Sequence, residues 1–215
     1  MKRLVLPRLY VILDAALLTV PETECAQRLA AAGVRLLQYR NKQASARELF
    51  ESSRRLSSLL IPQGVTFVVN DRADVALASD ASGVHVGQED LGAEAARSVM
   101  GVGKLLGVST HNLEQFKDAV QTSADYVAVG PVFSTSTKAN PDPVVGIELI
   151  RRLRPLTEKP IVAIGGITLE RAAEVLQAGA DSVAVISDIL LAPDPGQRAR
   201  NYIELLETAN HAAAD

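Results

Sequence analysis

Two carboxylates and three cations in this sequence could together bind a metal ion and a pyrophosphate group. Asp71, Asp90, Arg40, Lys42 and Lys138 all lie in short segments that follow apolar runs. Mg²⁺ in proteins takes one or two carboxylates and completes its shell with water and phosphate oxygens. Arginine and lysine neutralise the remaining charge of a phosphorylated leaving group. This set therefore indicates chemistry on a diphosphate, and a structural ring of salt bridges is the alternative.

A hydroxyl-rich loop from Gly130 to Lys138 follows the apolar run Tyr126–Val129. Thr135 and Thr137 could offer hydroxyl groups to an anion, beside several backbone amides and the Lys138 ammonium. The next helical pattern begins only near Gly146, so the loop is long for a connection after a strand. Such loops are often lids or binding loops, which favours an anion site over a merely solvated loop.

A second anion site is indicated further along the chain. Gly165 and Gly166 follow an apolar run and would let the backbone approach a ligand closely. Ile186 and Ser187 follow the next apolar run and open a helical turn. Helix N-termini bind phosphates well, so the sequence predicts a monophosphate site apart from the diphosphate site.

The histidines and the cysteine are less informative. His85 lies within an apolar run, which favours a buried, hydrogen-bonded role over catalysis. His111 could act as a base or orient a loop, and we favour the second role. Cys25, the only cysteine, excludes an internal disulfide and a cysteine metal cluster, and its amphipathic context predicts a packing residue.

Eight alternating strands and helices are predicted to position these residues, from hydrophobic periodicity and turn residues. The predicted strands are Leu9–Leu13, Leu36–Tyr39, Thr66–Val69, Val84–Val86, Leu105–Val108, Tyr126–Val129, Ile161–Ile164 and Ser182–Val185. The predicted helices are Glu22–Ala32, Ala46–Leu60, Ala73–Ala78, Ala93–Val99, Leu113–Gln121, Ile147–Leu153, Leu169–Gln177 and Gly196–Ala209.

Eight such units in 215 residues predict an α/β fold, a (β/α)8 TIM barrel that forms a single domain over residues 1–215 with a short polar C-terminal tail. A weak repeat supports this, because Ser123–Val129 and Gly179–Val185 share the pattern Ala-Asp-x-Val-Ala-Val. An open doubly wound sheet is the alternative, but Asp14-Ala-Ala is not its glycine-rich fingerprint. In a barrel, the unusual polar residues would meet at the C-terminal rim, the edge where the strands end.

Charge and hydropathy limit the classes of partner that the protein could bind. The net charge is −3 and the longest basic cluster has two residues, so we expect no nucleic acid. No apolar stretch approaches a bilayer span, and the apolar run after Arg8 is too short for a signal peptide core. We expect a soluble, cytoplasmic protein that binds small molecules and has no membrane partner, and a homo-oligomer is compatible with the sequence.

Six motifs in chain order resemble those of the thiamine-phosphate synthase family. They are Gln38-Tyr-Arg-Asn-Lys42, Asn70-Asp-Arg72, His85-Val-Gly-Gln-Glu-Asp90, Gly107-Val-Ser109, Gly130-Pro-Val-Phe-Ser-Thr-Ser-Thr-Lys138 and Ile164-Gly-Gly-Ile167. Each motif is weak alone, but six in order over nearly the whole chain are specific.

The resemblance implies an enzyme that joins 4-amino-5-hydroxymethyl-2-methylpyrimidine diphosphate to thiazole phosphate, with Mg²⁺ assisting a dissociative substitution. The products would be thiamine phosphate and pyrophosphate. The resemblance places the pyrimidine diphosphate at Gln38, Arg40, Lys42, Asn70, Ser109 and Lys138. It places the thiazole phosphate at Thr135, Thr137, Gly166, Ile186 and Ser187, and Mg²⁺ at Asp71 and Asp90.

Two departures from the family pattern stand out. Asn41 occupies a position where an acid is common, and Ala139–Pro143 is not a typical continuation of the Lys138 loop. Two other functions are compatible with the same barrel. One is a thiazole tautomerase, an isomerase that needs no diphosphate or metal, and the other is a non-catalytic regulator.

Overall fold

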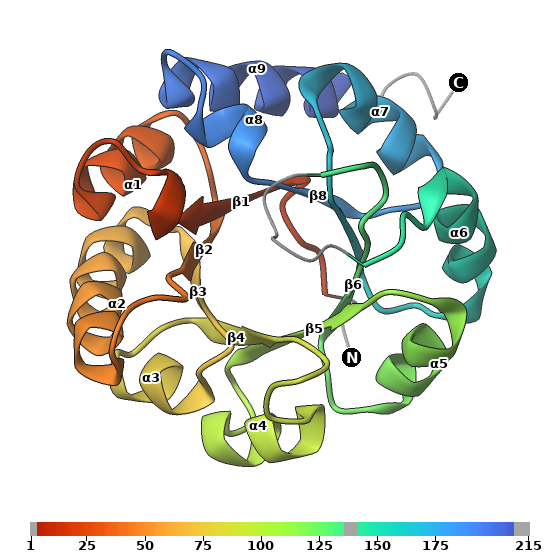
Figure 1. Ribbon diagram of the computed structural model, residues 1–215, viewed down its shortest axis with the longest axis horizontal. Helices are drawn as coiled ribbons and strands as arrows, with labels where there is room; N and C mark the ends of the chain where they lie inside the picture. The colour runs from red at the N-terminus through yellow and green to blue at the C-terminus, as the bar shows by residue number, and fades with distance from the viewer. Residues whose placement is uncertain (1–3, 136–141, 209–215) are drawn as a thin grey trace.

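Eight parallel strands close into a barrel in the order β1 to β8 (Figure 1). The structure is a computed structural model that describes residues 4–135 and 142–208. Each strand pairs in parallel register with its neighbours, and β1 pairs with β8 to complete the ring. The strands are β1 Leu9–Asp14, β2 Leu36–Arg40, β3 Thr66–Asn70, β4 Gly83–Val86, β5 Leu105–Thr110, β6 Tyr126–Val129, β7 Ile161–Ile164 and β8 Ser182–Val185.

Helices surround the barrel, and α9 packs against both α1 and α7 (Figure 1). Their bounds are α1 Glu22–Ala31, α2 Ala46–Leu60, α3 Ala73–Ala78, α4 Ala93–Met100, α5 Leu113–Gln121, α6 Gly146–Leu153, α7 Leu169–Gln177, α8 Ser187–Leu190 and α9 Pro195–Thr208. Short 3-10 turns lie at Ala15–Leu17, Ile61–Gln63 and Arg154–Leu156. None of the helices in the described ranges is long and apolar enough to span a bilayer. The predicted (β/α)8 barrel is therefore confirmed.

Local sequence accounts for the helix starts. Ser45 caps α2, where its side chain accepts from the amide of Glu48 and the Glu48 carboxylate accepts from the amide of Ser45. The Asn112 side chain caps α5 with a single hydrogen bond, which it accepts from the amide of Gln115 at 2.9 Å. Cys25 is buried in α1, as predicted.

Two apolar clusters hold the barrel together. The larger cluster lies between the outward strand faces and the helices. The smaller cluster contains only strand residues apart from Leu6, among them Tyr10, Leu36 and Tyr126, and therefore fills the barrel interior. Because successive strand residues point to opposite faces, Gln38 shares the interior face of β2 with Leu36.

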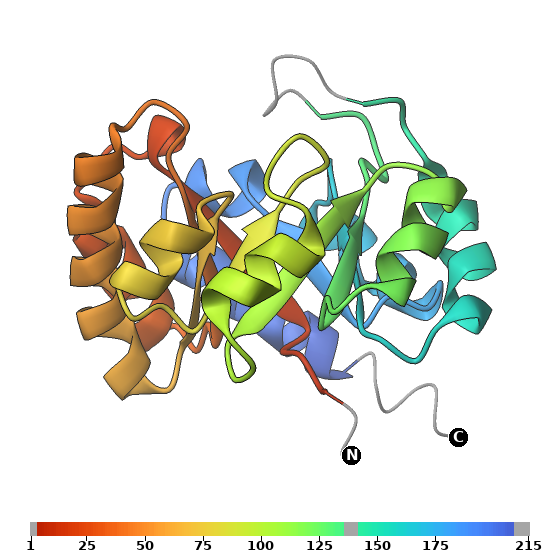
Figure 2. The ribbon, with the colours of Figure 1, turned by 90° about the horizontal axis from the view of Figure 1, so that it is seen from below.

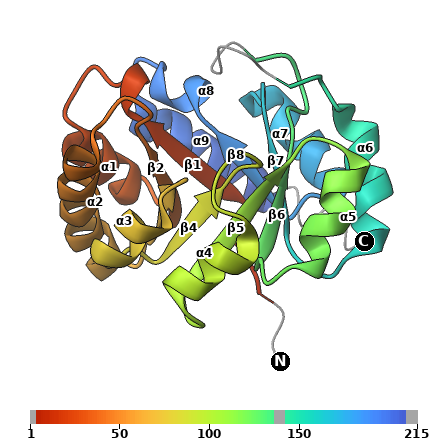
Figure 3. The ribbon, with the colours of Figure 1, turned by 60° about the horizontal axis from the view of Figure 1, so that its bottom comes forward.

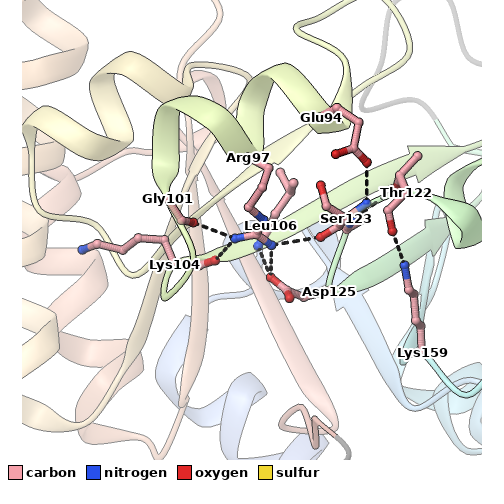
Figure 4. A network of polar contacts seen from close by, with 10 residues as sticks. Glu94, Arg97, Gly101, Lys104, Leu106, Thr122, Ser123, Asp125 and Lys159 are labelled. Carbon is pink, nitrogen blue, oxygen red and sulfur yellow. Dashed lines mark hydrogen bonds and ion pairs between the residues drawn. The ribbon is translucent and has the colours of Figure 1, made fainter. Parts of the chain in front are cut away.

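The repeated Ala-Asp pattern is a structural device. The side chain of Asp125, just before β6, accepts from the amide of Leu106 at 2.8 Å and from Arg97 at 2.7 Å (Figure 4). Asp181, just before β8, accepts from the amide of Ile161 at 2.8 Å and pairs with Arg154. Each aspartate thus links the residue just before its own strand to the start of the preceding strand, β5 for Asp125 and β7 for Asp181. These contacts lie at the strand starts, away from the predicted site.

The predicted element bounds hold to within one or two residues, with a consistent error at the strand ends. The strands β1, β2, β3 and β5 continue into the polar residues Asp14, Arg40, Asn70 and Thr110, whereas the prediction stopped where the apolar run stopped. Polar rim residues still pair through their backbones, as the register Asp14 to Arg40 shows. Residue 209, the predicted end of the last helix, and the predicted polar C-terminal tail lie outside the described residues.

The loops that carry the predicted site rise on one side of the barrel. Figure 2 shows the loop after β4 and the described part of the loop after β6 on the same side. The tilted view in Figure 3 shows α8 on this side as well. The barrel therefore brings the ends of distant strands to one rim, as its topology requires.

Candidate active site

Asp71 is held in a strained turn at the end of β3. Its φ of 65° lies in the left-handed region, which residues other than glycine seldom adopt. Its amide donates to the carbonyl of His85 at 2.7 Å, and the Arg72 amide donates to the Asn70 carbonyl at 2.8 Å. Strain of this kind persists where surrounding contacts impose it, and it gathers at functional sites. Here it turns Asp71 towards the loop after β4.

Asp90 meets Asp71 from that loop. Its carboxylate accepts from the amide of Gly87 at 2.8 Å, which fixes the turn after β4. Burial raises the pKa of Asp90, and the hydrogen-bonded carboxyl of Asp71 raises it further. Two carboxylates in contact repel when both are ionised, so this pair favours a cation.

Lys42 supplies one such cation. Its ammonium forms an ion pair with the carboxylate of Asp71. The lysine side chain is exposed, whereas the carboxylate is mostly covered. The cation can therefore leave the carboxylate without a buried group losing its packing.

Arg40 has a different partner, which sequence reasoning missed. Its guanidinium forms an ion pair with Asp14, whose side chain is 3% exposed. The second oxygen of Asp14 accepts from the amide of Ala16 at 3.1 Å. A buried carboxylate needs such partners, and in return it holds the guanidinium at the rim.

Gln38 and Ser109 lie at opposite ends of a buried hydrogen-bond chain, which is called the interior chain below. The Gln38 amide nitrogen donates to the Tyr10 hydroxyl at 2.8 Å, and the Tyr10 and Tyr126 hydroxyls lie 3.0 Å apart. The Tyr126 hydroxyl lies 2.9 Å from His85 Nδ1, and His85 Nε2 lies 2.8 Å from Ser109 Oγ. The chain links β2 to β5 through the barrel interior.

The interior chain is uncharged near neutral pH. Burial lowers the pKa of His85 to about 4, and the nearby Asp90 only partly offsets this effect. Burial also raises the pKa of Tyr10 and of Tyr126 above the usual tyrosine range. His85 is thus a buried, hydrogen-bonded residue, as predicted.

Three of the residues predicted for the second phosphate follow neighbouring strands: Gly166 comes after β7, and Ile186 and Ser187 come after β8. A Cβ on Gly166, whose φ is 62°, would lie 2.3 Å from the carbonyl oxygen of Ser134, so this glycine lets two rim loops pack together. Ile186 precedes α8 and Ser187 is its first residue. Amides at a helix start have no helical carbonyl to bind and remain available to an anion. Thr135 lies half-buried in the loop after β6.

The short helix α8 is anchored from behind. The carboxylate of Asp188 accepts from the Tyr202 hydroxyl at 2.6 Å and from the Arg198 guanidinium at 3.0 and 3.1 Å. The arginine neutralises a carboxylate that would otherwise repel a phosphate beside Ser187. Sequence reasoning gave no role to this cluster.

The carboxylates of Asp71 and Asp90 are ligands that fit a hard divalent cation. Among residues 4–135 and 142–208, no group of three or more His, Cys, Asp or Glu side chains could hold a metal ion. The two adjacent carboxylates of Asp71 and Asp90 suit Mg²⁺, whose remaining ligands are commonly water and substrate phosphate.

Comparison with known proteins identifies the family. The family model for thiamine monophosphate synthase matches residues 9–189. The chain belongs to the thiamine-phosphate synthase family. A thiamine-phosphate synthase from Koribacter versatilis is 52% identical over 210 residues, which cover 94% of this chain and 97% of the relative. One from Chloroflexus aurantiacus is 44% identical over 207 residues, 96% of this chain and 95% of the relative.

A solved structure agrees. Thiamine phosphate pyrophosphorylase from Pyrococcus furiosus superposes with a TM-score of 0.86 at 35% identity, covering 94% of this chain and 96% of that one. Membership in the thiamine-phosphate synthase family confirms the resemblance that the six motifs predicted.

The described part of this synthase-family chain brings most of the predicted residues to one rim. Asn70 ends β3 and pairs in register with His85, and Ser109 lies near the end of β5. Thr137 and Lys138 lie outside the described residues. His111 Nδ1 donates to the carbonyl of Gly130 at 2.6 Å, which agrees with its predicted role in orienting a loop.

Sequence reasoning missed the residues behind the site. Asp14, Tyr10 and Tyr126 support Arg40 and Gln38 from strands far away in sequence. The signal available in the sequence was a hydroxyl or carboxylate side chain in or at the end of an otherwise apolar strand. Such a group, once buried, must find a partner.

Proposed function

We propose that this protein joins an aminopyrimidine diphosphate to thiazole phosphate and releases pyrophosphate and thiamine phosphate. The observation that carries the proposal is the contact of Asp71 with both Asp90 and Lys42 at the C-terminal rim, where Arg40 ends the neighbouring strand β2. Such a set suits a substrate that leaves with several negative charges. Membership in the thiamine-phosphate synthase family supports this choice of substrates.

The first substrate occupies the half of the rim formed by β2 to β5. Gln38, Asn70 and Ser109 would contact the pyrimidine ring, because their side chains can hydrogen-bond to its amino group and ring nitrogens. Arg40, Lys42 and Lys138 would hold the diphosphate. A charge-assisted hydrogen bond from a guanidinium is stronger than a neutral one, and Asp14 keeps the Arg40 guanidinium in place.

Asp71 and Asp90 would hold Mg²⁺, which would neutralise charge on the departing pyrophosphate. The raised pKa of Asp90 and its contact with Asp71 support this assignment, because two covered carboxylates gain most from a cation. Lys42 would move from Asp71 to the diphosphate when the substrate and metal arrive. Thus the chain would exchange one internal ion pair for contacts to the substrate.

The reaction would be a dissociative substitution. The bond between the pyrimidine methylene carbon and the diphosphate oxygen breaks first, and the oxygen keeps the electron pair. The electron-rich aminopyrimidine ring shares the resulting positive charge. The thiazole nitrogen then supplies its lone pair to the carbon, and no proton has to move. The chain's part is to stabilise the leaving group and align the nucleophile.

The thiazole phosphate would bind across the ends of β6 to β8. Thr135 and Thr137 would offer hydroxyl groups, and the backbone around Gly166, Ile186 and Ser187 would offer amides. The anchored position of Asp188 supports this assignment, because Arg198 and Tyr202 keep α8 fixed. We further propose that the enzyme acts in the cytoplasm on these small molecules, with no nucleic acid or membrane partner, and a homo-oligomer is compatible with this role.

The test is to mix the protein with both substrates and Mg²⁺ and to measure thiamine phosphate and pyrophosphate. Asp71→Asn and Asp90→Asn should each lower kcat by at least about 100-fold, since charge stabilisation at the leaving group is a large catalytic contribution. Asp74→Asn is the matched control, because Asp74 pairs with Arg72 on the surface of α3. Isomerisation of a thiazole alone would indicate a tautomerase, and no turnover would indicate a regulator. Full activity in EDTA would exclude the metal site.

A further inference from the structure

The interior chain has a direction that its hydrogens must follow. The Gln38 amide nitrogen can only donate, so the Tyr10 oxygen accepts from it. The Tyr10 hydroxyl then donates to Tyr126, the next group in reach. Each hydroxyl that accepts a hydrogen bond from the group on its Gln38 side therefore donates to the group on its Ser109 side.

The direction passes through the histidine ring. The Tyr126 hydroxyl donates to His85 Nδ1, which must therefore be unprotonated. Neutral His85 then carries its proton on Nε2 and donates it to Ser109 Oγ. The Ser109 hydroxyl, having accepted from the ring, can donate its own proton to a further acceptor.

Both ends of the interior chain lie on strands, β2 and β5, whose C-terminal ends form part of the proposed pyrimidine half of the rim. At one end, Gln38 uses its nitrogen on Tyr10, and no described residue bonds to its amide oxygen, Oε1. At the other end, Ser109 lies partly exposed near the end of β5. The chain thus offers an acceptor at Gln38 and a donor at Ser109.

From this geometry we infer that Tyr10, Tyr126 and His85 are positioning residues that fix the hydrogen-bond direction at both ends of the chain and so select an aminopyrimidine over an oxopyrimidine. An aminopyrimidine edge carries an amino donor beside a ring-nitrogen acceptor, which complements Gln38 and Ser109. The oxo analogue has an oxygen acceptor beside an N–H donor, the opposite order. This inference rests on the proposed function for the identity of the substrate.

Burial makes the direction difficult to reverse. Gln38 is 2% exposed and His85 is 7% exposed, and a buried polar group without a partner is unfavourable. Reversal would require the amide, both hydroxyls and the imidazole proton to change together. Gly107 makes the central contact possible, because a Cβ there would lie 2.0 Å from Cζ of Tyr126 and 2.5 Å from Nδ1 of His85.

The direct test is the tautomer of His85 in the unmodified protein. The protein contains three histidines, so ¹⁵N-histidine labelling gives few signals. The signal that is lost in His85→Gln is the one that belongs to His85. We expect an unprotonated Nδ1 and a protonated Nε2 at pH 7. A proton on Nδ1, or a charged ring, would overturn the inferred direction whatever the substrate is.

Specificity is tested with Tyr126→Phe, which removes one hydroxyl from the middle of the chain and keeps the ring. The preference in kcat/KM for the aminopyrimidine diphosphate over its oxo analogue should fall by roughly tenfold, mainly through KM. Tyr39→Phe is the control, since Tyr39 is also buried, and among the described residues its hydroxyl bonds only to Asn41, which is not part of the interior chain. An unchanged preference in Tyr126→Phe would overturn the role in specificity. Failure of the unmodified protein to use the aminopyrimidine diphosphate would instead contradict the proposed function.

Discussion

The ammonium of Lys42 forms an ion pair with the carboxylate of Asp71, so the cation that we propose for the diphosphate occupies the carboxylate that we propose for the metal. The same carboxylate contacts Asp90, whose pKa is raised by burial and by this neighbour. The three groups form one electrostatic unit, in which removal of any charge changes how the others bind.

Lys42→Gln should therefore separate metal binding from substrate binding. Without substrate, the variant should bind Mg²⁺ roughly threefold to tenfold more tightly, because the metal no longer competes with the ammonium at Asp71. Its kcat/KM should nevertheless fall, since the diphosphate loses a cation. Titration calorimetry measures the change in Mg²⁺ affinity. Lys117→Gln, at an exposed position of α5, is the control. Weaker Mg²⁺ binding in Lys42→Gln would contradict the account.

Asp90→Asn should stabilise the metal-free protein while it removes activity. The native pKa of Asp90 is raised, so ionisation at pH 7 disfavours the folded state. The gain in free energy of unfolding should be under about 1 kcal/mol, because the group is partly solvated. It should vanish as the pH falls below about 3.9, where Asp90 is protonated in both states. Urea unfolding in EDTA measures it.

Asp74→Asn should change the free energy of unfolding in the opposite direction from Asp90→Asn. The pKa of Asp74 is lowered by its hydrogen bonds to Arg72, so ionised Asp74 favours the folded state. This variant should lose stability at pH 7 rather than gain it. Equal effects of the two substitutions would contradict the assignment of Asp90 to a repelling pair.

His85 should make stability depend on pH between about 4 and 6.5. Its native pKa is about 4 and its ordinary value is 6.5, so the unfolded chain binds more protons in this window. Stability should rise with pH across the window, by about 3 kcal/mol from this residue. His85→Gln should have a flatter profile in chemical denaturation. Parallel profiles for the two proteins would show that His85 is not buried in its neutral form.

Gly107→Ala should be strongly destabilising. A Cβ at residue 107 would lie 2.0 Å from the ring of Tyr126, which is fully buried and cannot move away freely. Overpacking of this kind lowers the free energy of unfolding by about 1–3 kcal/mol. Gly103→Ala is the matched control, since no atom lies within 4 Å of its added Cβ. Similar melting temperatures for both variants would contradict the interior packing.

The fold was predictable because its signals are local. Apolar runs such as Tyr126–Val129 and capping residues such as Ser45 mark each strand and helix where it occurs. The meeting of Asp71 and Asp90 at one rim was predictable for a related reason, because each follows a strand and parallel strands end at one rim.

The supporting residues were not predictable in the same way. Tyr10 and Tyr126 are 116 positions apart in sequence, and only closure of the barrel brings their hydroxyls together. The pair of Asp14 with Arg40 likewise depends on the register of β1 against β2. Apolar periodicity specifies which face a residue occupies, but not which polar partner it meets there.

Single-turnover rates with electron-poor pyrimidine diphosphates test the central claim most directly. If the site works by stabilising a departing pyrophosphate, the ring must carry positive charge at the transition state. An electron-withdrawing group on the pyrimidine should then slow thiamine phosphate formation severely, in proportion to its effect on cation stability. Equal single-turnover rates for the plain and electron-poor substrates would contradict the account and indicate direct displacement by the thiazole nitrogen.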